Sequence, residues 1–505
     1  MLTMTLAQFE AEAKTYDTIP MSAKVFADTK TPIQLFHLFN EQASFLLESK
    51  DPLSPWSNYS FIGLNPRYYI EDHQGEFVFN NSNGKTILKA NQFQQAWEQA
   101  LSYINVSPKT PDLPFPGGAV GYLGFEAYHY YEPRLASAKD GGSNEHDVFF
   151  MFCETILAYH HGKEELTVVH LQDKGLNLPK DAYKEGEKRI QEILHTIEQD
   201  VVSPVTMTPL GDALEEDFFA NVKSNYTKKS YMADVEKIKE YIAAGDIFQA
   251  VLSQRFELPI KSDGLSLYRV LRKINPSPYL YYIRCQGQEI IGSSPERLVK
   301  VDENKTLEIH PIAGTRKRGQ TKEEDQALAD DLLADEKERA EHLMLVDLAR
   351  NDIGRVSEYG SVTVKDMMHV SYFSHVMHLT TVVNGKLKQK AHPFEALFST
   401  HPAGTVSGAP KVRAVEIIQQ LEQMRRGVYA GAIAYCGFNE AIDSCIAIRT
   451  IVLKKGVAYV QAGAGIVQDS VPESEYEETR SKAKALIYAI KLAEMRYNQE
   501  EVTKR

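Results

Sequence analysis

"PYLYYIRCQGQEIIGSSPERLVKVDENKTLEIHPIAGT", residues 278–315, is the stretch that most clearly indicates the fold. Its short apolar runs, rich in Tyr, Ile and Val, are separated by brief polar breaks. Such runs predict strands joined in series as hairpins. Long helical patterns lie apart from them, at 335–356 and from Ser474 to about 498. Strands grouped in hairpins with separate long helices are typical of an α+β fold, and not of a doubly wound parallel sheet.

The length of the chain, 505 residues, predicts two domains or one very large mixed domain, because simple single cores stop growing beyond about 250–300 residues. Residues 201–216 contain prolines and few large apolar side chains, which predicts a linker. An amphipathic helical pattern, "KKSYMADVEKIKEYIAAGD", follows it. We therefore expect an N-terminal region over 1–200 and a second domain over 217–497.

The charge and the cysteines exclude several classes of protein. With 68 acidic and 56 basic residues, the net charge of −12 argues against a general nucleic-acid binder. Cys153, Cys285, Cys436 and Cys445 show no CxxC spacing, so free thiols in a reducing compartment are expected. The first residues lack the apolar core of a signal peptide, and no apolar run has the length of a membrane span. We expect a cytoplasmic protein that binds neither nucleic acid nor a membrane.

Two predicted helices each bring paired carboxylates to one face. Glu338 and Glu341 are three residues apart in "KERAEHLML". Glu475 and Glu478 have the same spacing in "SEYEETRSKAKALIYAIKL", and Lys482 lies further along that face. Together the helices could hold a divalent cation, with Mg²⁺ favoured because it needs few protein ligands. The alternative is two solvated faces with local Glu–Lys pairs.

Candidate anion-binding groups occur in other stretches. Gly463-Ala464-Gly465 in "VQAGAGIV" predicts a turn at a strand end, whose N–H groups can surround an anion or simply close the turn. Arg449 lies in the apolar run "CIAIRTIV", where an inward cation needs an anionic partner from the protein or a ligand. His378 fits a buried hydrogen-bonded histidine as well as a catalytic one. Together with the N–H groups near 314–315, these features suit a small dianionic carboxylate.

Six ordered motifs carry a family resemblance. The motifs are "PIAGTRKRG", "ERAEHLMLVDLARNDIGRV", "GTVSGAPKVRAVEII", "GVYAGAIAYCGF", "CIAIRTIV" and "AGAGIVQDSVPESEYEETRSKA". They resemble the chorismate-utilising enzymes and cover residues 217–497 almost continuously. The N-terminal segments "SFLLES", "YSFIGLNP" and "FPGGAVGYLGFEAY" also fit. Within the family, the chain is similar to the large subunits of anthranilate synthases.

The resemblance implies a reaction. Ammonia adds at C2 of chorismate while the C4 hydroxyl leaves with the help of Mg²⁺, and elimination of pyruvate then makes the ring aromatic. Mg²⁺ is placed on Glu341 and Glu478, with Glu475 and the catalytic Glu338 beside them. Glu296 in "GSSPERL" is implied as the acid that protonates the departing hydroxyl.

The resemblance also assigns the remaining site residues. His378 corresponds to the histidine of the elimination step, and Thr405 is placed with the catalytic residues. The residues implied to bind the substrate are Gln249, Gly314, Thr315, Tyr429, Arg449, Gly463, Ala464, Gly465 and Lys482.

Two positions separate this chain from other branches of the family. Members that add water carry a lysine as general base where this chain has Gln249, and ammonia needs no such base. Many aminodeoxychorismate synthases, which make the para isomer, carry a nucleophilic lysine in "PIKGT", where this chain has Ala313. That enzyme is the alternative within the family. A chorismate-like ligand sensor without catalysis is the alternative outside it.

Regulation and partners follow from the same resemblance. Ser49, Pro278, Tyr279 and Leu280 match the tryptophan-inhibition pocket of anthranilate synthases, in which the position of Leu280 is usually methionine. Leucine is a near-isosteric apolar replacement, so we expect the pocket to persist. The chain lacks the Cys-His-Glu set of a glutamine amidotransferase. We therefore expect a separate small subunit that supplies ammonia, in a hetero-oligomer.

Overall fold

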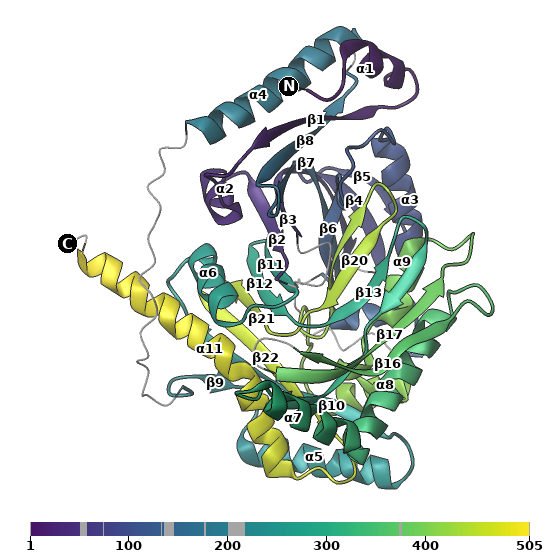
Figure 1. Ribbon diagram of the computed structural model, residues 1–505, viewed down its shortest axis with the longest axis vertical. Helices are drawn as coiled ribbons and strands as arrows, with labels where there is room; N and C mark the ends of the chain where they lie inside the picture. The colour runs from purple at the N-terminus through teal and green to yellow at the C-terminus, as the bar shows by residue number, and fades with distance from the viewer. Residues whose placement is uncertain are drawn as a thin grey trace.

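A computed structural model describes most of the chain and assigns it an α+β architecture (Figure 1). The predicted linker at 201–216 lies outside the described residues. Side chains are described only up to residue 495. The positions left undescribed are Met1, 51–57, Gln74, Pro133, 136–145, 176–177, 200–217, 373–375 and 504–505.

The stretch at 278–315 forms two hairpins and a further strand. Its strands are β11 (Tyr279–Cys285), β12 (Gln288–Ser294), β13 (Arg297–Val301), β14 (Thr306–Ile309) and β15 (Ile312–Lys317). β11 and β12 pair antiparallel across Gln286 and Gly287, whose φ angles of 51° and 72° fit a type I′ turn. β13 and β14 form the second hairpin.

The predicted hairpin series is interrupted between β12 and β13. β12 pairs with β21 (Thr450–Lys454), whereas β13 pairs with β20 (Ile442–Ile446). Pro295 lies at the crossing and has no N–H to donate to a ladder. The chain therefore passes at Glu296 from one strand pair to another.

The described strands belong to a single, largely antiparallel sheet, as an α+β fold predicts. The strands of the N-terminal region are β1 (Thr18–Phe26), β2 (Ala43–Glu48), β3 (Tyr59–His73), β4 (Glu76–Asn81), β5 (Thr86–Ala90), β6 (Gly118–Leu123), β7 (Val148–His160) and β8 (Glu165–Asp173). The other strands are β9 (Lys223–Ser224), β10 (Gln249–Pro259), β16 (Thr363–Tyr372), β17 (Val376–Lys386), β18 (Gly408–Ala409), β19 (Ala432–Gly437) and β22 (Val457–Ile466).

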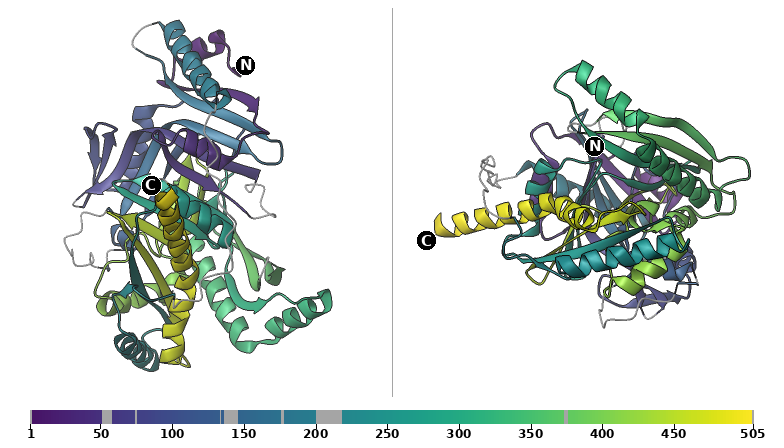
Figure 2. Two further views of the ribbon diagram at one scale, coloured as in Figure 1. Left: turned by 90° about the vertical axis from the view of Figure 1, so that its left-hand side faces the viewer. Right: turned by 90° about the horizontal axis from the view of Figure 1, so that it is seen from below.

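Helices cover the sheet on its outside. In Figure 1, α4 lies across the N-terminal strands and α5 lies at the opposite end of the molecule, while α11 runs past β22 and projects from the body in Figure 2. The helices are α1 (Leu6–Glu12), α2 (Pro32–Leu38), α3 (Phe93–Ile104), α4 (Pro179–Glu198), α5 (Lys228–Ala243), α6 (Gly264–Ile274), α7 (Lys322–Ala334), α8 (Glu336–Gly354), α9 (Pro393–Thr400), α10 (Lys411–Leu421) and α11 (Pro472–Thr503), with the 3₁₀ helices η2 (Phe125–Tyr130) and η3 (Gly404–Val406).

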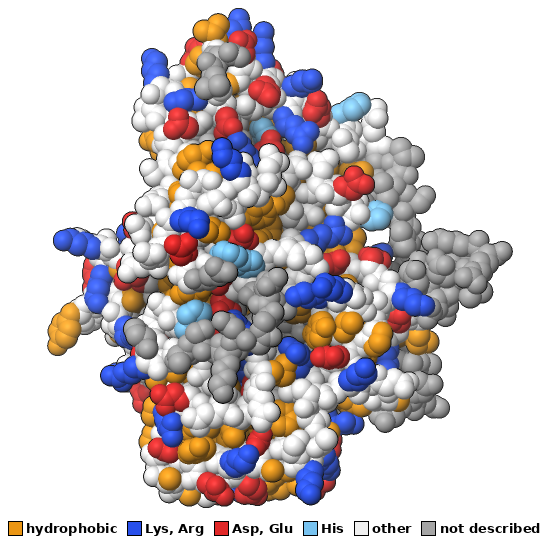
Figure 3. All heavy atoms as spheres, turned by 180° about the vertical axis from the view of Figure 1, so that it is seen from behind, with side chains coloured by type: hydrophobic (Ala, Val, Ile, Leu, Met, Phe, Trp, Pro, Cys, Tyr) orange, Lys and Arg blue, Asp and Glu red, His pale blue; other side chains and the backbone are white. Residues whose placement is uncertain are grey.

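The molecular surface mixes both signs of charge. On the face shown in Figure 3, Lys and Arg side chains are interspersed with Asp and Glu side chains and with apolar ones. Among the described residues, no helix combines the length and the apolar composition that a membrane crossing needs.

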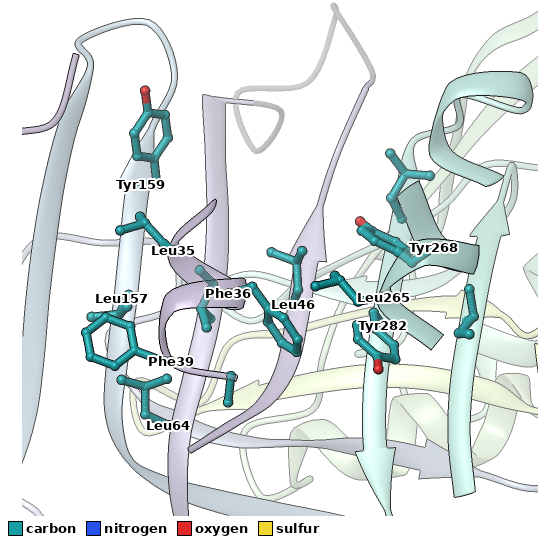
Figure 4. Close-up of a cluster of buried hydrophobic side chains, with 14 of the residues drawn as sticks. Leu35, Phe36, Phe39, Leu46, Leu64, Leu157, Tyr159, Leu265, Tyr268 and Tyr282 are labelled. Atoms are coloured by element: carbon teal, nitrogen blue, oxygen red, sulfur yellow. The ribbon is translucent and has the colours of Figure 1, made fainter. Parts of the chain in front are cut away.

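The hydrophobic core joins the two parts of the chain. In Figure 4, Phe36 of α2 and Leu46 of β2 pack toward Leu265 and Tyr268 of α6 and Tyr282 of β11. The sheet crosses the same boundary, because β2 pairs with β11 and β6 pairs with β19. The N-terminal region therefore shares both core and sheet with the part that follows the predicted linker. The boundaries at 200 and 217 remain predictions.

Candidate active site

Carboxylates from α8 and α11 lie close enough to shift one another's pKa. The side chain of Asp335 caps α8 by accepting the N–H of Glu338 over 3.1 Å. The pKa of Glu341 is raised by burial and further by the charges of Glu338 and Glu478. Burial also raises the pKa of Glu475. Since Glu478 and Glu475 belong to α11, the two predicted helix faces converge.

Cations partly balance these carboxylates. Lys482 Nζ lies 2.7 Å from Glu478 Oε1 and donates to the carbonyl oxygen of Gly463 over 3.0 Å. Arg316 Nη1 lies 3.6 Å from Glu338 Oε1. The local Glu–Lys pair expected of a solvated helix face therefore exists at Glu478, but its lysine also contacts the edge of β22.

The Glu341 and Glu478 carboxylates have the chemistry that Mg²⁺ binding needs. Among the residues that the structure describes, no three His, Cys, Asp or Glu side chains form a complete metal-binding group. Glu341 and Glu478 nevertheless approach from separate helices, and their mutual repulsion is relieved by a cation. Mg²⁺ usually keeps several waters and binds through one or two carboxylates plus substrate oxygens. The pair fits that mode of binding.

Gly463-Ala464-Gly465 lies inside β22, paired with β10, and not in the turn predicted from the sequence. Close packing explains the glycine at the first of these positions. A Cβ atom on Gly463 would lie 2.9 Å from Val251 Cγ1 of β10, too close for a side chain. The glycines therefore permit a close approach of two strands.

The register nevertheless directs two of these amides away from β10. Val251, opposite Gly465, donates its N–H to the carbonyl oxygen of Ser407 over 2.9 Å. Val251 and Gly465 are therefore a pair without hydrogen bonds to each other. Because bonded and non-bonded pairs alternate along an antiparallel ladder, Gly463 and Ser253 form another such pair. The N–H groups of Gly465 and Gly463 consequently face the other edge of β22. β21 pairs with that edge only as far as Val460. The two N–H groups therefore lie beyond the end of β21, on the side of Lys482.

Tyr429 and Gln249 lie on the same side of β22. A Cβ on Gly463 would be 3.0 Å from the Tyr429 hydroxyl, and one on Gly465 would be 2.7 Å from Gln249 Nε2. Positions i and i+2 of a strand point to one side, which places both side chains together. Burial raises the pKa of Tyr429 to about 12, so its hydroxyl keeps its proton. The buried Oε1 of Gln249 has no hydrogen-bond partner among the described residues.

Arg449 lies at the break between β20 and β21, with a φ of 51°, and not within a strand as its apolar surroundings predicted. Its half-buried guanidinium has its pKa lowered by burial, which the nearby Tyr429 partly opposes. In the part of the chain that is described, no carboxylate lies within ion-pair distance of it. A cation in this position favours an anionic ligand.

A bulge in β15 carries Gly314 and Thr315, where the register with β17 shifts. Gly314 has a φ of 67°, which favours glycine, and its carbonyl oxygen lies 2.7 Å from His378 Nδ1. A carbonyl oxygen only accepts, so Nδ1 carries the hydrogen and Nε2 is unprotonated in the neutral ring. Burial lowers the pKa of His378 and so favours this neutral ring. A Cβ on Gly314 would lie 3.3 Å from Glu338 Oε2, so the bulge adjoins the α8 carboxylates.

The cations after this bulge bind the neighbouring helices. Arg316 contacts Asp331 of α7 over 2.7 Å and Asp335 over 2.9 Å, and Arg318 contacts Asp325 of α7 over 2.6 Å. These ion pairs fasten β15 to α7 and to the start of α8. They explain a basic stretch in an acidic protein without a ligand.

Glu296 lies between β12 and β13, beside η3. Thr405 Oγ1 donates to Glu296 Oε1 over 3.0 Å. Burial raises the pKa of Glu296 to about 7, although the Thr405 hydrogen bond and the charge of Lys482 act to lower it. A carboxyl group of this kind is partly protonated near neutral pH and can act as an acid.

The pairing of β2 with β11 gathers the residues predicted to bind tryptophan. Leu280 lies opposite Glu48, and Ser49 is the next residue after it. The following N–H, of residue 50, donates to the carbonyl oxygen of residue 277 over 3.2 Å. Ser49 therefore lies beside Pro278 and Tyr279, although about 230 residues of chain separate them.

Comparison with known proteins identifies the family of the chain. Residues 42–488 match the family described as chorismate binding enzyme. The chain belongs to the chorismate-binding enzyme family. Anthranilate synthase component 1 of Geobacillus stearothermophilus is 49% identical over 503 residues, covering 98% of each chain. The protein of the same name from Bacillus subtilis is 46% identical over 505 residues, covering 98% of this chain and 96% of that one.

Solved structures show the same chorismate-binding enzyme fold. The crystal structure of anthranilate synthase component I from Streptococcus pneumoniae aligns with a TM-score of 0.72 at 37% identity, covering 92% of this chain and 99% of that one. The menaquinone-specific isochorismate synthase of Escherichia coli, at 19% identity, aligns with a TM-score of 0.68 and shares the fold. The names of the full-length relatives do not favour the aminodeoxychorismate synthase alternative.

One residue that supports this candidate site, Arg426, was not predicted from the sequence. Arg426 is almost fully buried, forms an ion pair with Glu422 over 2.6 Å and donates to the carbonyl oxygens of Val251 and Val406. Its guanidinium carbon lies 5.7 Å from the centre of the Tyr429 ring. Arg426 therefore ties together β10, η3 and Tyr429. Its position three residues before Tyr429 was the only signal in the sequence.

A second missed residue, Arg297, links the predicted tryptophan-binding residues to the catalytic region. Its Nε donates to the Tyr279 hydroxyl over 2.7 Å, and that hydroxyl donates to Asp443 over 3.0 Å. Arg297 follows Glu296 directly in the sequence. Tyr279 is therefore one hydrogen bond from the neighbour of the predicted acid.

Proposed function

We propose that the chain is the large subunit of an anthranilate synthase, which converts chorismate and ammonia to anthranilate and pyruvate in an Mg²⁺-dependent reaction. The observation that carries this proposal is Gln249. Its side chain lies beside Tyr429 in the site and brings an amide where a water-adding enzyme would need a base. The full-length relatives named anthranilate synthase component 1 support the same conclusion.

The cationic and N–H groups would bind the two carboxylates of chorismate. Arg449 has no carboxylate partner among the described residues, Lys482 adjoins β22, and Tyr429 retains a hydroxyl proton to donate. The N–H groups of Gly463 and Gly465 face the same edge. These donors would orient the chorismate ring. The small side chain of the intervening Ala464 would allow the ring to approach β22 closely.

Glu341 and Glu478 would hold Mg²⁺, with Glu475 and Glu338 beside them. When bound, the ion would neutralise the ring carboxylate and the charge that develops as the C4 oxygen leaves. The protein's own part is to bring these carboxylates together from α8 and α11. Gly314 and Thr315 would form the adjoining wall.

Two residues would move protons. As nitrogen forms its bond to C2 and the C4–O bond breaks, the departing oxygen takes the proton of Glu296 and leaves as water. Thr405 would hold the Glu296 carboxyl group in position. In the second step, Nε2 of His378 would remove the proton at C2 while the C3–O bond breaks and pyruvate leaves. The Gly314 carbonyl fixes the tautomer that this step needs.

The supply of ammonia and the regulation are further parts of the proposal. A separate glutamine amidotransferase subunit would deliver ammonia in a hetero-oligomer, and the relatives' designation as component 1 supports a second component. Tryptophan would inhibit by binding at Ser49, Pro278, Tyr279 and Leu280. The four described cysteines are free, which agrees with a cytoplasmic location.

Product identification tests the proposal. The purified chain is incubated with chorismate, ammonium and Mg²⁺, and products are separated and identified by mass and fluorescence. We expect anthranilate and an equal amount of pyruvate, and no turnover with glutamine unless the small subunit is added. A para-amino product that retains the pyruvyl group would indicate aminodeoxychorismate synthase. Binding of chorismate without turnover would indicate a sensor.

A further inference from the structure

A small recess adjoins Glu296 and has no role in the steps described above. Its volume is about 40 Å³, and Glu296 and Thr405 are among the residues that line it. Leu345 and Leu348 of α8 form one wall. Glu341 of the proposed metal site does not line it, although it lies on the same helix.

The helix geometry places the α8 residues that line the recess relative to Glu341 of the proposed metal site. Glu341, Leu345, Leu348 and Asp352 are spaced by four, three and four residues, so they share one face of α8. At about 1.5 Å per residue, the stretch from Leu345 to Asp352 begins roughly 6 Å beyond Glu341 and continues for about 10 Å. The part of the recess that α8 lines therefore lies beyond Glu341, toward the C-terminal end of the helix.

The size and polarity of the recess suit water. A water molecule occupies about 30 Å³ in the liquid and needs two to four polar partners when buried. Glu296, Thr405 and His310 are polar residues among those that line the recess, and the His310 side chain is about one third exposed to solvent. Asp352 also lines the recess, and its carboxylate is bound by Lys411 over 2.8 Å. The leucines restrict the space to a small molecule.

We propose that this recess receives the water that forms at C4 during amination and connects Glu296 to solvent. This inference rests on the proposed function. When ammonia bonds to C2 and the C4–O bond breaks, the oxygen leaves with the proton of Glu296, and one water and one carboxylate remain. The water moves into the recess instead of back across the ring. A proton lost by the new ammonium group to solvent returns to Glu296 through the same water-filled path.

The two half-reactions allow a test, because only amination releases water at C4. Ala349 lines the recess from α8, and Ala349→Val fills part of it. We expect amination of chorismate to slow at least tenfold with little change in the KM for chorismate. Elimination of pyruvate from the supplied C2-aminated intermediate should stay within twofold of the unmodified enzyme. Ala340→Val, at an exposed position of the same helix, is the matched control and should change neither rate.

Two results would overturn the proposal. One is unchanged amination in Ala349→Val, and the other is equal slowing of both half-reactions. If Ala349→Val does not fold, Ala403→Val, at a lining residue outside α8, fills part of the recess and carries the same expectations. If the unmodified enzyme aminates no chorismate at all, the proposed function fails and not the recess alone.

Discussion

The Thr405 hydroxyl donates to the Glu296 carboxyl group over 3.0 Å and joins residues 109 positions apart. The bond favours the ionised carboxylate, whereas burial favours the neutral acid and raises the pKa to about 7. The protonation of Glu296 near neutral pH is therefore a balance between these two effects. Removing the hydroxyl shifts that balance toward the acid.

This balance predicts a pH dependence for amination. Glu296 must be protonated to act, so the rate per free ammonia should fall as pH rises through about 7. In Thr405→Val the carboxylate loses a donor, its pKa rises, and the fall should move to higher pH. The measurement is the initial rate from pH 5.5 to 9, corrected for free ammonia. Glu296→Gln should lose most activity and this pH dependence. A fall that stays at the same pH in Thr405→Val contradicts the role of the bond.

Glu341 should control the dependence on Mg²⁺. Glu341→Gln keeps the shape of the side chain but removes the charge that, with Glu478, would bind the ion. We expect turnover to fall at least a hundredfold and not to recover at saturating Mg²⁺. Glu336→Gln makes the same change at an exposed position of α8 and should leave the Mg²⁺ titration unchanged. An unaltered titration in Glu341→Gln would remove the metal role.

Replacing Arg449 should weaken the binding of chorismate without lowering the stability of the fold. Its guanidinium is half-buried without a carboxylate partner among the described residues, so the folded protein gains little from its charge. Arg449→Met should raise the KM for chorismate at least tenfold, which is about 1.4 kcal/mol, while the melting temperature stays equal or rises. Arg350→Met, at an exposed ion pair, is the control for KM. A lower melting temperature with unchanged KM would show that Arg449 is structural.

Local sequence patterns predicted individual elements better than their pairing. The short apolar runs at 278–315 correctly indicated the β11–β12 and β13–β14 hairpins, and the helical pattern at 335–356 indicated α8. The pairing of β12 with β21 could not be predicted in this way, because it joins segments about 160 residues apart through packing across the sheet. Only Pro295 signalled the crossing between β12 and β13.

The sequence predicted which residue types form the candidate site, but it predicted their backbone geometry less well. Arg449 was expected to need an anion, but its left-handed backbone at a strand break depends on how β20 and β21 turn. Gly463 and Gly465 were expected in a turn, whereas the neighbouring β10 keeps them in an extended strand. Arg426 gave no signal beyond its place three residues before Tyr429, because the carbonyl groups that it binds on β10 and η3 are distant in the sequence.

Glu126 should make stability depend on pH. It accepts the N–H groups of Arg426 and Gly427, just before Tyr429, and burial raises its pKa to about 7. The neutral form is favoured on folding, so this contribution is full below the unfolded pKa of 4.5 and is lost as pH rises through 7. Relative to Glu126→Gln, the wild type should lose roughly 3 kcal/mol of unfolding free energy from pH 4.5 to pH 8. Denaturant unfolding at several pH values measures it, and a constant difference would contradict the assignment.

Ser49 should couple tryptophan to the reaction. The β2–β11 pairing places it beside Tyr279, whose hydroxyl receives a hydrogen bond from Arg297, the neighbour of Glu296. A ligand that displaces Tyr279 can therefore disturb the acid. We expect micromolar tryptophan to lower the activity of the wild type, and Ser49→Ala to weaken both tryptophan binding by calorimetry and inhibition at least tenfold. Ser44→Ala, on the same strand, should keep both. Binding without inhibition in the wild type would break this link, and no binding would remove the regulatory site.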